Sequence, residues 1–279
     1  MNTTINGVTY YYEWLSVYKP DQPTLVCLHG FTGTSQTFTS VFQKKSDINI
    51  LAIDLIGHGQ TDCYVHPYRY QMDCLCQDIA LLTEHLGIFQ FSLLGYSMGA
   101  RAALGFTHLF PQKIQQLILE SGSPGLQSKS ERIVRKCSDE HLASFIMSHP
   151  IEDFVDNWEQ LPLFETQKRL SPKVQGTLRQ ERLSQRNFGL ACSLWFMGTG
   201  VQPDFWQELN KIKIPTLLIV GELDLKFQDI AKKMQEKQPD LVIEVVQDAG
   251  HCIHLEKPQV FEKIVYTFLS SFTNQSLGK

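Results

Sequence analysis

The pentapeptide Gly95-Tyr96-Ser97-Met98-Gly99 decides how this chain folds, because it matches the G-x-S-x-G pattern of a nucleophile elbow. Residues 91–94 before it are an apolar run typical of a buried strand, and residues 100–106 after it are the small and apolar residues of a helix. A serine on such a strand-to-helix turn exposes its hydroxyl at the helix N-terminus, where partial positive charge stabilises anions. Ser-x-Gly clusters also occur in ordinary turns, so the rest of the sequence has to support this interpretation.

The composition favours a folded protein with a buried core. The chain has 279 residues, a hydrophobic share of 43% and a net charge of −4. It has no apolar run of the ~18 residues that span a bilayer, no long basic run and no export signal in its first residues. Its seven cysteines are scattered without a C-x-x-C spacing, which favours reduced thiols over disulfides or a zinc site. We therefore expect a cytoplasmic protein that neither inserts into a membrane nor binds nucleic acid.

Strand and helix patterns alternate along most of the chain. Strand-like runs occupy residues 8–15, 24–28, 48–53, 91–94, 114–119, 214–220 and 241–246, and helical patterns occupy residues 70–86, 230–238 and 260–271. Residues 126–207 lack convincing strands and consist of short helical stretches divided by prolines. The pattern predicts an α/β fold with a mostly parallel central sheet flanked by helices. Residues 1–125 and 208–279 are then the core domain, and residues 126–207 are a helical cap insertion.

Two residues that follow predicted strands can complete a catalytic triad with Ser97. Asp224 follows the strand of residues 214–220, and His251 follows the strand of residues 241–246. The chain order of serine, acid and histidine is that of a G-x-S-x-G site, and both residues fall at carboxyl ends of parallel strands. The histidine takes the serine proton, and the carboxylate holds the histidine tautomer.

Several other residues compete for these roles. Glu222 is an alternative to Asp224, whereas Asp54 precedes the serine and is more simply a structural loop residue. His254 lies one turn beyond His251 and suggests a shared metal, but a single i,i+3 pair is weak evidence. We therefore predict no metal site and no cofactor.

An oxyanion hole requires two backbone N–H groups aimed at one point. Met98 follows the serine and supplies one by position, and Phe31, in the loop of residues 29–33, is expected to supply the other. His29 in the same loop is more simply a structural residue than an acid–base catalyst. With the motifs HGFTG, DLIGHG, GYSMG, GELD and AGH in this order, the whole chain resembles proteins of the α/β-hydrolase fold. That resemblance specifies a fold and says little about the reaction.

Arg101 indicates the substrate class. It lies four residues after Ser97, one turn along the predicted elbow helix, so its guanidinium can reach the active-site cavity. An unpaired buried charge is costly, which leaves either a salt bridge to a core carboxylate or a bidentate grip on an anionic substrate. In the cap, Trp158 and Phe164 are candidates for the wall of the cavity, although core packing is the simpler explanation for aromatic residues.

The motifs GYSMGAR, SGSPGL, ER-x-x-R, W-x-x-x-P-x-F, GTGVQP and GELDLKF resemble one branch of this fold, from about residue 25 to residue 268. That branch is the 2-succinyl-6-hydroxy-2,4-cyclohexadiene-1-carboxylate synthases of menaquinone biosynthesis. The resemblance implies a lyase that expels pyruvate from 2-succinyl-5-enolpyruvyl-6-hydroxy-3-cyclohexene-1-carboxylate, a small-molecule tricarboxylate. It also implies that Ser97 acts as a base, and not as a nucleophile.

The same resemblance implies that Arg101, Arg135 and Arg182 bind substrate carboxylates. Arg132 competes with Arg135 for the first cap position, and Arg179 and Arg186 compete with Arg182 for the second, since each lies within about a turn. Tyr96 either lines the pocket or packs in the core. A serine carboxylesterase or carbon–carbon bond hydrolase remains an alternative, as does a non-catalytic ligand receptor, and the sequence leaves the oligomeric state open.

Overall fold

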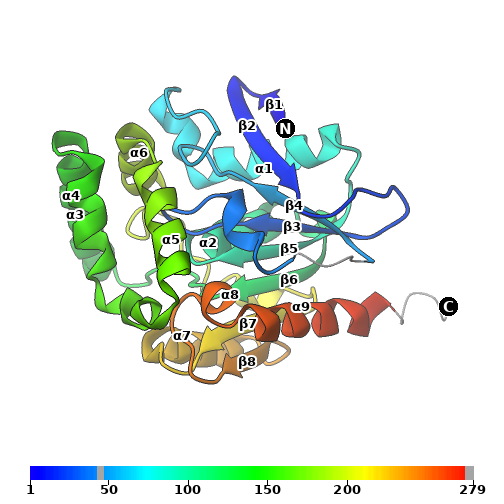
Figure 1. Cartoon of the computed structure of the whole chain (residues 1–279). Coiled ribbons are helices and arrows are strands. Elements are labelled where there is room, and N and C mark those ends of the chain that lie inside the picture. The colour runs from blue at the N-terminus through cyan, green and yellow to red at the C-terminus, as the bar shows by residue number, and fades with distance from the viewer. Residues whose placement is uncertain (43–46, 274–279) are drawn as a thin grey trace.

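A twisted sheet of eight strands runs through the part of the chain that the computed structural model describes, residues 1–42 and 47–273 (Figure 1). The spatial order is β1-β2-β4-β3-β5-β6-β7-β8. Its strands are β1 (Asn2–Ile5), β2 (Val8–Trp14), β3 (Thr24–Leu28), β4 (Asn49–Ile53), β5 (Phe91–Tyr96), β6 (Ile114–Glu120), β7 (Thr216–Gly221) and β8 (Val242–Val246). β2 pairs antiparallel with both β1 and β4. The strands β3 to β8 are all parallel to one another.

Helices cover both faces of this sheet and bury its central strands. They are α1 (Met72–His85), α2 (Met98–Leu109), α7 (Leu225–Lys237), α8 (Ile253–Glu256) and α9 (Pro258–Thr273), with short 3-10 helices η1 (Ser35–Phe38), η2 (Pro67–Tyr70), η3 (Pro111–Lys113) and η5 (Leu209–Lys211). Alternate residues of β3 enter opposite halves of the core: Val26 and Leu28 pack with α1 and α2, and Leu25 and Cys27 pack with η1 and α9. A parallel sheet requires such cover on both faces, which explains its continuous apolar strands.

Helices alone lie between β6 and β7 among the described residues. They are α3 (Lys129–Ser148), α4 (Ile151–Glu159), η4 (Pro162–Arg169), α5 (Pro172–Leu183), α6 (Asn187–Met197) and the η5 turn named above, and Figure 1 shows the four α-helices grouped at one side of the sheet. Prolines mark the boundaries, since η4 and α5 begin at a proline and Pro150 precedes α4. These helices share their own apolar cluster, in which Ala143, Phe154 and Leu190 are fully buried.

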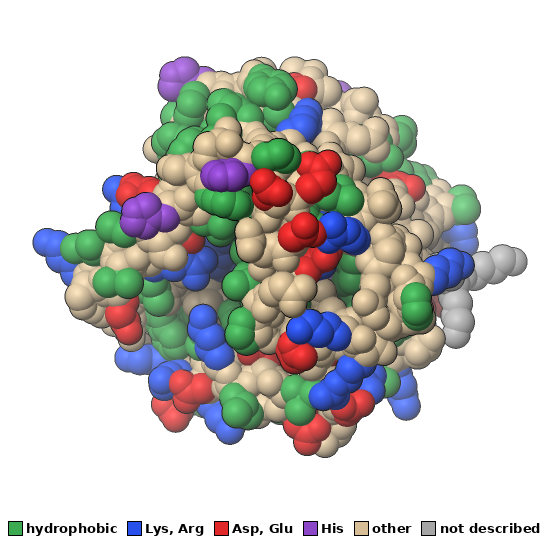
Figure 2. Space-filling view, turned by 60° about the vertical axis from the view of Figure 1, so that its left-hand side comes forward, with side chains coloured by type: hydrophobic (Ala, Val, Ile, Leu, Met, Phe, Trp, Pro, Cys, Tyr) green, Lys and Arg blue, Asp and Glu red, His purple; other side chains and the backbone are tan. Residues whose placement is uncertain are grey.

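Two further features of the fold are the distribution of charge on its surface and the length and polarity of its helices. On the face shown in Figure 2, basic and acidic side chains are interspersed. Within residues 1–42 and 47–273, the helices are too short or too polar to cross a membrane.

Candidate active site

The elbow serine occupies a strained turn between β5 and α2. Ser97 has a φ of 51° and a ψ of −103°, a backbone conformation that residues other than glycine rarely adopt. A Cβ on Gly95 would lie 2.3 Å from the carbonyl oxygen of Gly99, and one on Gly99 would lie 2.1 Å from that of Leu28. The flanking glycines are therefore sterically required, and the turn exposes the serine hydroxyl at the start of α2.

Ser97, His251 and Asp224 form a connected hydrogen-bonded chain. His251 Nδ1 lies 2.7 Å from Asp224 Oδ2, and because a carboxylate only accepts, Nδ1 carries the proton. The free Nε2 then accepts from Ser97 Oγ at 3.0 Å. Glu222, the alternative acid, instead accepts a hydrogen bond from the Asp248 backbone at 2.9 Å. The geometry is that of a serine primed to lose its proton to histidine.

The surroundings of His251 hold its ring in place. The imidazole is 2% exposed, and the rings of Phe227 and Tyr96 lie 4.6 Å and 5.5 Å from it, centroid to centroid. The backbone of its loop is tied down as well, because Ser121 Oγ donates to the His251 carbonyl at 2.9 Å. Tyr96 thus packs against the His251 imidazole and also lines a small cavity.

The loop of residues 29–33 lies directly against the elbow. A Cβ on Gly30 would meet the Tyr96 ring at 2.6 Å and the Ser97 Cβ at 3.6 Å. His29 fixes this loop: its Nε2 accepts from Leu55 N at 2.9 Å, and its Nδ1 donates to the Gly30 carbonyl at 2.7 Å. Burial lowers the pKa of His29 to about 4, so the ring is neutral. Phe31, one of the two predicted oxyanion-hole residues, directly follows Gly30 in this loop. Met98, the other, begins α2, where a first-turn N–H has no partner within the helix.

The guanidinium of Arg101 contacts only neutral oxygens. It donates to the Met197 carbonyl and to Gln202 Oε1, both at 2.7 Å. None of the ion pairs in the described part of the chain involves Arg101. Desolvation first, and then the positive charge of Arg135, lower its pKa to about 10. The Asp139 carboxylate raises the pKa of Arg101 but makes no ion-pair contact with it. A core salt bridge therefore does not explain the guanidinium, which leaves room for an anionic ligand.

The arginines of α3 differ in their partners. Arg135 Nε donates to Asp139 at 2.8 Å and its side chain is partly exposed. Arg132 donates to the Gln202 carbonyl at 2.8 Å, so it and Arg101 meet at the same glutamine. Of Arg132 and Arg135, it is the charge of Arg135 that lowers the pKa of Arg101.

The arginines on α5 and just after it form a separate group. Arg182, on α5, donates to Glu159 Oε1 at 3.0 Å and to Gln167 Oε1 at 2.7 Å, and its guanidinium carbon lies 5.2 Å from the centroid of the Phe164 ring. Arg179 pairs with Asp156 and Glu159, and Arg186 donates to backbone carbonyls of residues 59 and 61. All three arginines thus have partners within the protein, and Arg182 is the one of the three that lines a cavity.

A small cavity of about 30 Å³ adjoins the elbow. Its walls include Phe31, Tyr96, Phe164, Arg182 and Glu181. The Trp158 ring packs between Phe31 and Phe164, with centroid distances of 5.3 Å and 5.5 Å, and faces a second, apolar hollow of about 270 Å³ between α3 and α4. Arg101 and Arg135 are not among the walls of the small cavity, so the structure does not bring the three predicted arginines together.

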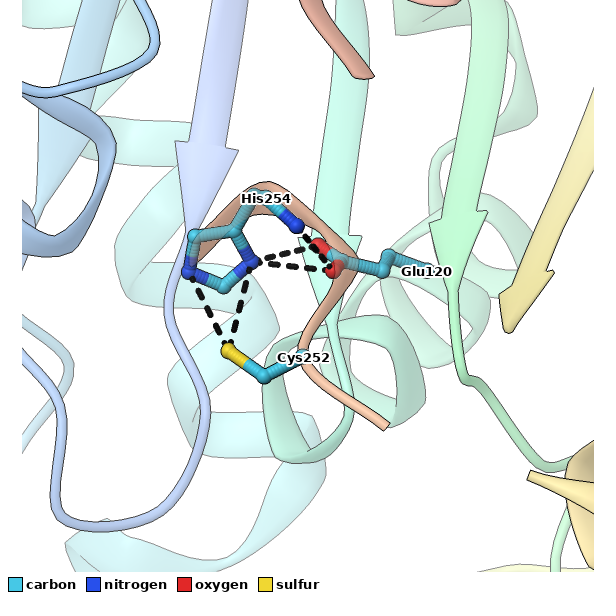
Figure 3. A group of neighbouring side chains, drawn as sticks. All are labelled: Glu120, Cys252 and His254. Carbon is cyan, nitrogen blue, oxygen red and sulfur yellow. Dashed lines mark hydrogen bonds and ion pairs between the residues drawn. The ribbon is translucent and has the colours of Figure 1, made fainter. Parts of the chain in front are cut away.

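Some polar residues near the site were not singled out by sequence reasoning. Gln202 orients Arg101, and Gln167 orients Arg182; both are buried polar residues in segments without a periodic pattern, so composition gave no signal for them. Glu120, at the end of β6, pairs with His254 and not with the triad (Figure 3). His254 therefore belongs to a different cluster from His251, contrary to the shared metal site weighed above.

Comparisons with known proteins agree with this geometry. The family model of the alpha/beta hydrolase fold matches residues 23–258, so the chain is an α/β-hydrolase-fold protein. A protein of Bacillus subtilis (strain 168), provisionally named 2-succinyl-6-hydroxy-2,4-cyclohexadiene-1-carboxylate synthase, is 41% identical over 88% of this chain and 90% of that protein. The synthase of the same name from Serratia proteamaculans (strain 568) is 29% identical over 90% of this chain and 94% of its own.

Solved structures extend the comparison. The structure of MenH from S. aureus has a TM-score of 0.85 and 34% identity, and the match covers 94% of this chain and 98% of that one. An esterase from Thermogutta terrifontis, at 23% identity and a TM-score of 0.81, shares the fold. The chain therefore belongs to the 2-succinyl-6-hydroxy-2,4-cyclohexadiene-1-carboxylate synthase family, and it is a lyase of menaquinone biosynthesis.

Proposed function

We propose that this enzyme expels pyruvate from 2-succinyl-5-enolpyruvyl-6-hydroxy-3-cyclohexene-1-carboxylate and leaves the conjugated ring diene named in its family. The observation that supports this substrate most directly is the Arg101 guanidinium, one turn from Ser97 on α2 and held by two neutral oxygens. A carboxylate of the substrate supplies the ion-pair contact that Arg101 lacks and can accept two parallel N–H bonds. A neutral ester would leave that cation unpaired.

The proposed chemistry uses Ser97 as a base. His251, held by Asp224, takes the serine hydroxyl proton, and the serine oxygen takes the ring proton α to the succinyl carbonyl. Negative charge then builds on that carbonyl oxygen, where the N–H groups of Phe31 and Met98 stabilise it. The electrons return through the ring, the bond between the ring carbon and the enolpyruvyl oxygen breaks, and the released enolpyruvate takes up a proton to become pyruvate.

The remaining arginines complete the proposed recognition of a tricarboxylate. Arg135 lies close enough to Arg101 to act on its pKa, and it is partly exposed. Arg182 lines the small cavity beside Phe31, with Phe164 under its guanidinium. We assign these two to the other carboxylates, with Trp158 and Tyr96 as neighbouring walls.

We further propose that residues 126–207 are a cap over a core of residues 1–125 and 208–279. The separate apolar cluster of α3, α4 and α6 supports this division, and its contact with Phe31 links the cap to the proposed oxyanion hole. A cytoplasmic location is part of the same proposal, and the seven cysteines without a disulfide among the described residues are compatible with it.

Replacing Arg101 by alanine tests the substrate assignment. We expect kcat/KM for the tricarboxylate to fall by about 100-fold or more, because losing a charge-assisted bidentate contact costs roughly 3 kcal/mol. The matched control is Arg179→Ala, which removes a partly exposed cap arginine whose partners are Asp156 and Glu159 and leaves kcat/KM within about threefold. Equal kinetics for Arg101→Ala and the wild type would contradict the assignment.

A further inference from the structure

A fully buried ion pair lies behind the catalytic triad. His254 Nδ1 is 2.7 Å and 2.9 Å from the two carboxylate oxygens of Glu120, and the backbone N–H of His254 donates to the same carboxylate at 2.9 Å. Both side chains are 0% exposed. Figure 3 shows Glu120 at the end of β6 facing His254, whose loop also carries Cys252.

The pair connects three segments around the site, namely the Ser97 elbow, the segment that carries His251, and η1. The Glu120 carbonyl accepts the Ser97 N–H at 2.9 Å, so the residue that binds His254 through its side chain also fixes the elbow through its backbone. His254 lies three residues after His251. Its Nε2 is 2.8 Å from Thr37 Oγ1, on η1, the helix that follows the loop carrying Phe31.

The His254 ring is charged in this environment. Burial alone lowers its pKa, but the Cys252 sulfur and the Glu120 carboxylate raise the pKa well above its ordinary value. An imidazolium donates from both nitrogens, one to Glu120 and the other to Thr37. Each charge therefore has an opposite charge or an acceptor, which is the condition under which a buried pair is tolerated.

Stability alone is a poor reason to keep such a pair, because apolar residues of similar volume often stabilise a core at least as well. Metal binding does not account for it either. Glu120, Cys252 and His254 place their donor atoms within 4.8 Å, but both ring nitrogens already have hydrogen-bond partners. A metal ion would have to displace those contacts in a site sealed from solvent.

We propose that Glu120 and His254 are positioning residues that hold the His251 loop in register with the Ser97 elbow. The pair acts through the backbone and touches no substrate. Without the pair, α8 and the residues that precede it shift relative to β6, which misaligns the contact of His251 Nε2 with Ser97 Oγ. The inference rests on the proposed function only for its kinetic readout.

The test compares Glu120→Gln, His254→Gln and the double variant with the wild type, at equal folded fraction by circular dichroism. We expect each single variant to lose about 10- to 100-fold in kcat, the cost of a misplaced catalytic group, with KM within about twofold. The double variant should lose no more than either single variant, because both remove one interaction. The control is Asp78→Asn, which removes a buried ion pair with Arg69 between α1 and η2, and should keep wild-type kcat.

A second readout does not depend on turnover. The proton that His251 Nδ1 shares with Asp224 is expected to give a low-field NMR resonance, absent in His251→Gln. It should shift or broaden in the Glu120 and His254 variants and stay in place in Asp78→Asn. Wild-type resonance and kcat in both site variants would overturn the proposal, whereas a wild type without pyruvate release would count against the proposed function alone.

Discussion

At the residue scale, Ser97 shows how the role proposed for its hydroxyl constrains the backbone. Its positive φ is a conformation that costs a residue with a side chain of order 1–3 kcal/mol, and the glycines two positions before and after it only relieve the contacts around it. The strain is retained because it brings Oγ to 3.0 Å from His251 Nε2 at the start of a helix.

Ser97→Gly and Ser97→Ala separate this strain from the chemistry. Both variants lack the hydroxyl, so we expect both to lose at least about 10³-fold in kcat. Glycine adopts positive φ freely and alanine does not, so Ser97→Gly should be more stable than Ser97→Ala by about 1 kcal/mol. Urea unfolding of the two proteins measures the difference. Equal stability, or a more stable alanine variant, would mean that the turn is not strained.

At the scale of elements, the site depends on loops that follow neighbouring strands. The loops after β3 and β4 are joined through His29, whose neutral ring accepts from Leu55 and donates to Gly30. The loops after β7 and β8 are joined by backbone bonds, one of them from Leu223 N to the Ala249 carbonyl at 2.9 Å. The central strands were predictable because apolar runs and turn residues are local signals, and each predicted central strand is present.

Tertiary contacts set the element boundaries that the sequence placed less well. The helix predicted at residues 230–238 begins at Leu225, because the Asp224 carboxylate caps it through Phe227 N at 3.4 Å while also binding His251. The strand β1 was not predicted, since three of its four residues are polar and the strand is stabilised by pairing with β2.

The neutral state of His29 predicts acid sensitivity. In the unfolded chain this histidine binds a proton below pH ~6.5, whereas burial delays protonation in the fold to about pH 4. The unfolded state therefore binds more protons in this range, so the free energy of unfolding falls as the pH decreases from ~6.5 to ~4, by up to about 3 kcal/mol from this group.

Urea unfolding at several pH values measures this loss, with His29→Gln as the control. The variant is expected to be less stable at pH 7, because it loses a buried hydrogen bond, and to lose less stability on acidification than the wild type. Parallel slopes for the two proteins over this range would show that His29 is not responsible.

At the scale of the whole molecule, the sequence predicted the sheet, the order of the triad residues and the family. It did not predict which oxygens hold each arginine, because partners such as Gln202 for Arg101 and Glu159 for Arg182 lie 101 and 23 residues apart in the chain. Those contacts arise only after α5, α6 and the residues that follow them have packed. They also decide which guanidinium is left without an ion-pair contact and so can bind a ligand.

The most direct test of the central claim is to incubate the purified protein with 2-succinyl-5-enolpyruvyl-6-hydroxy-3-cyclohexene-1-carboxylate, and separately with a p-nitrophenyl ester. Pyruvate is followed by a coupled assay and the conjugated diene by its ultraviolet absorbance, with Ser97→Ala as the blank. We expect equimolar pyruvate and diene from the wild type, and ester turnover slower by orders of magnitude. Rapid ester hydrolysis without pyruvate release would contradict the account and identify a hydrolase on the same fold.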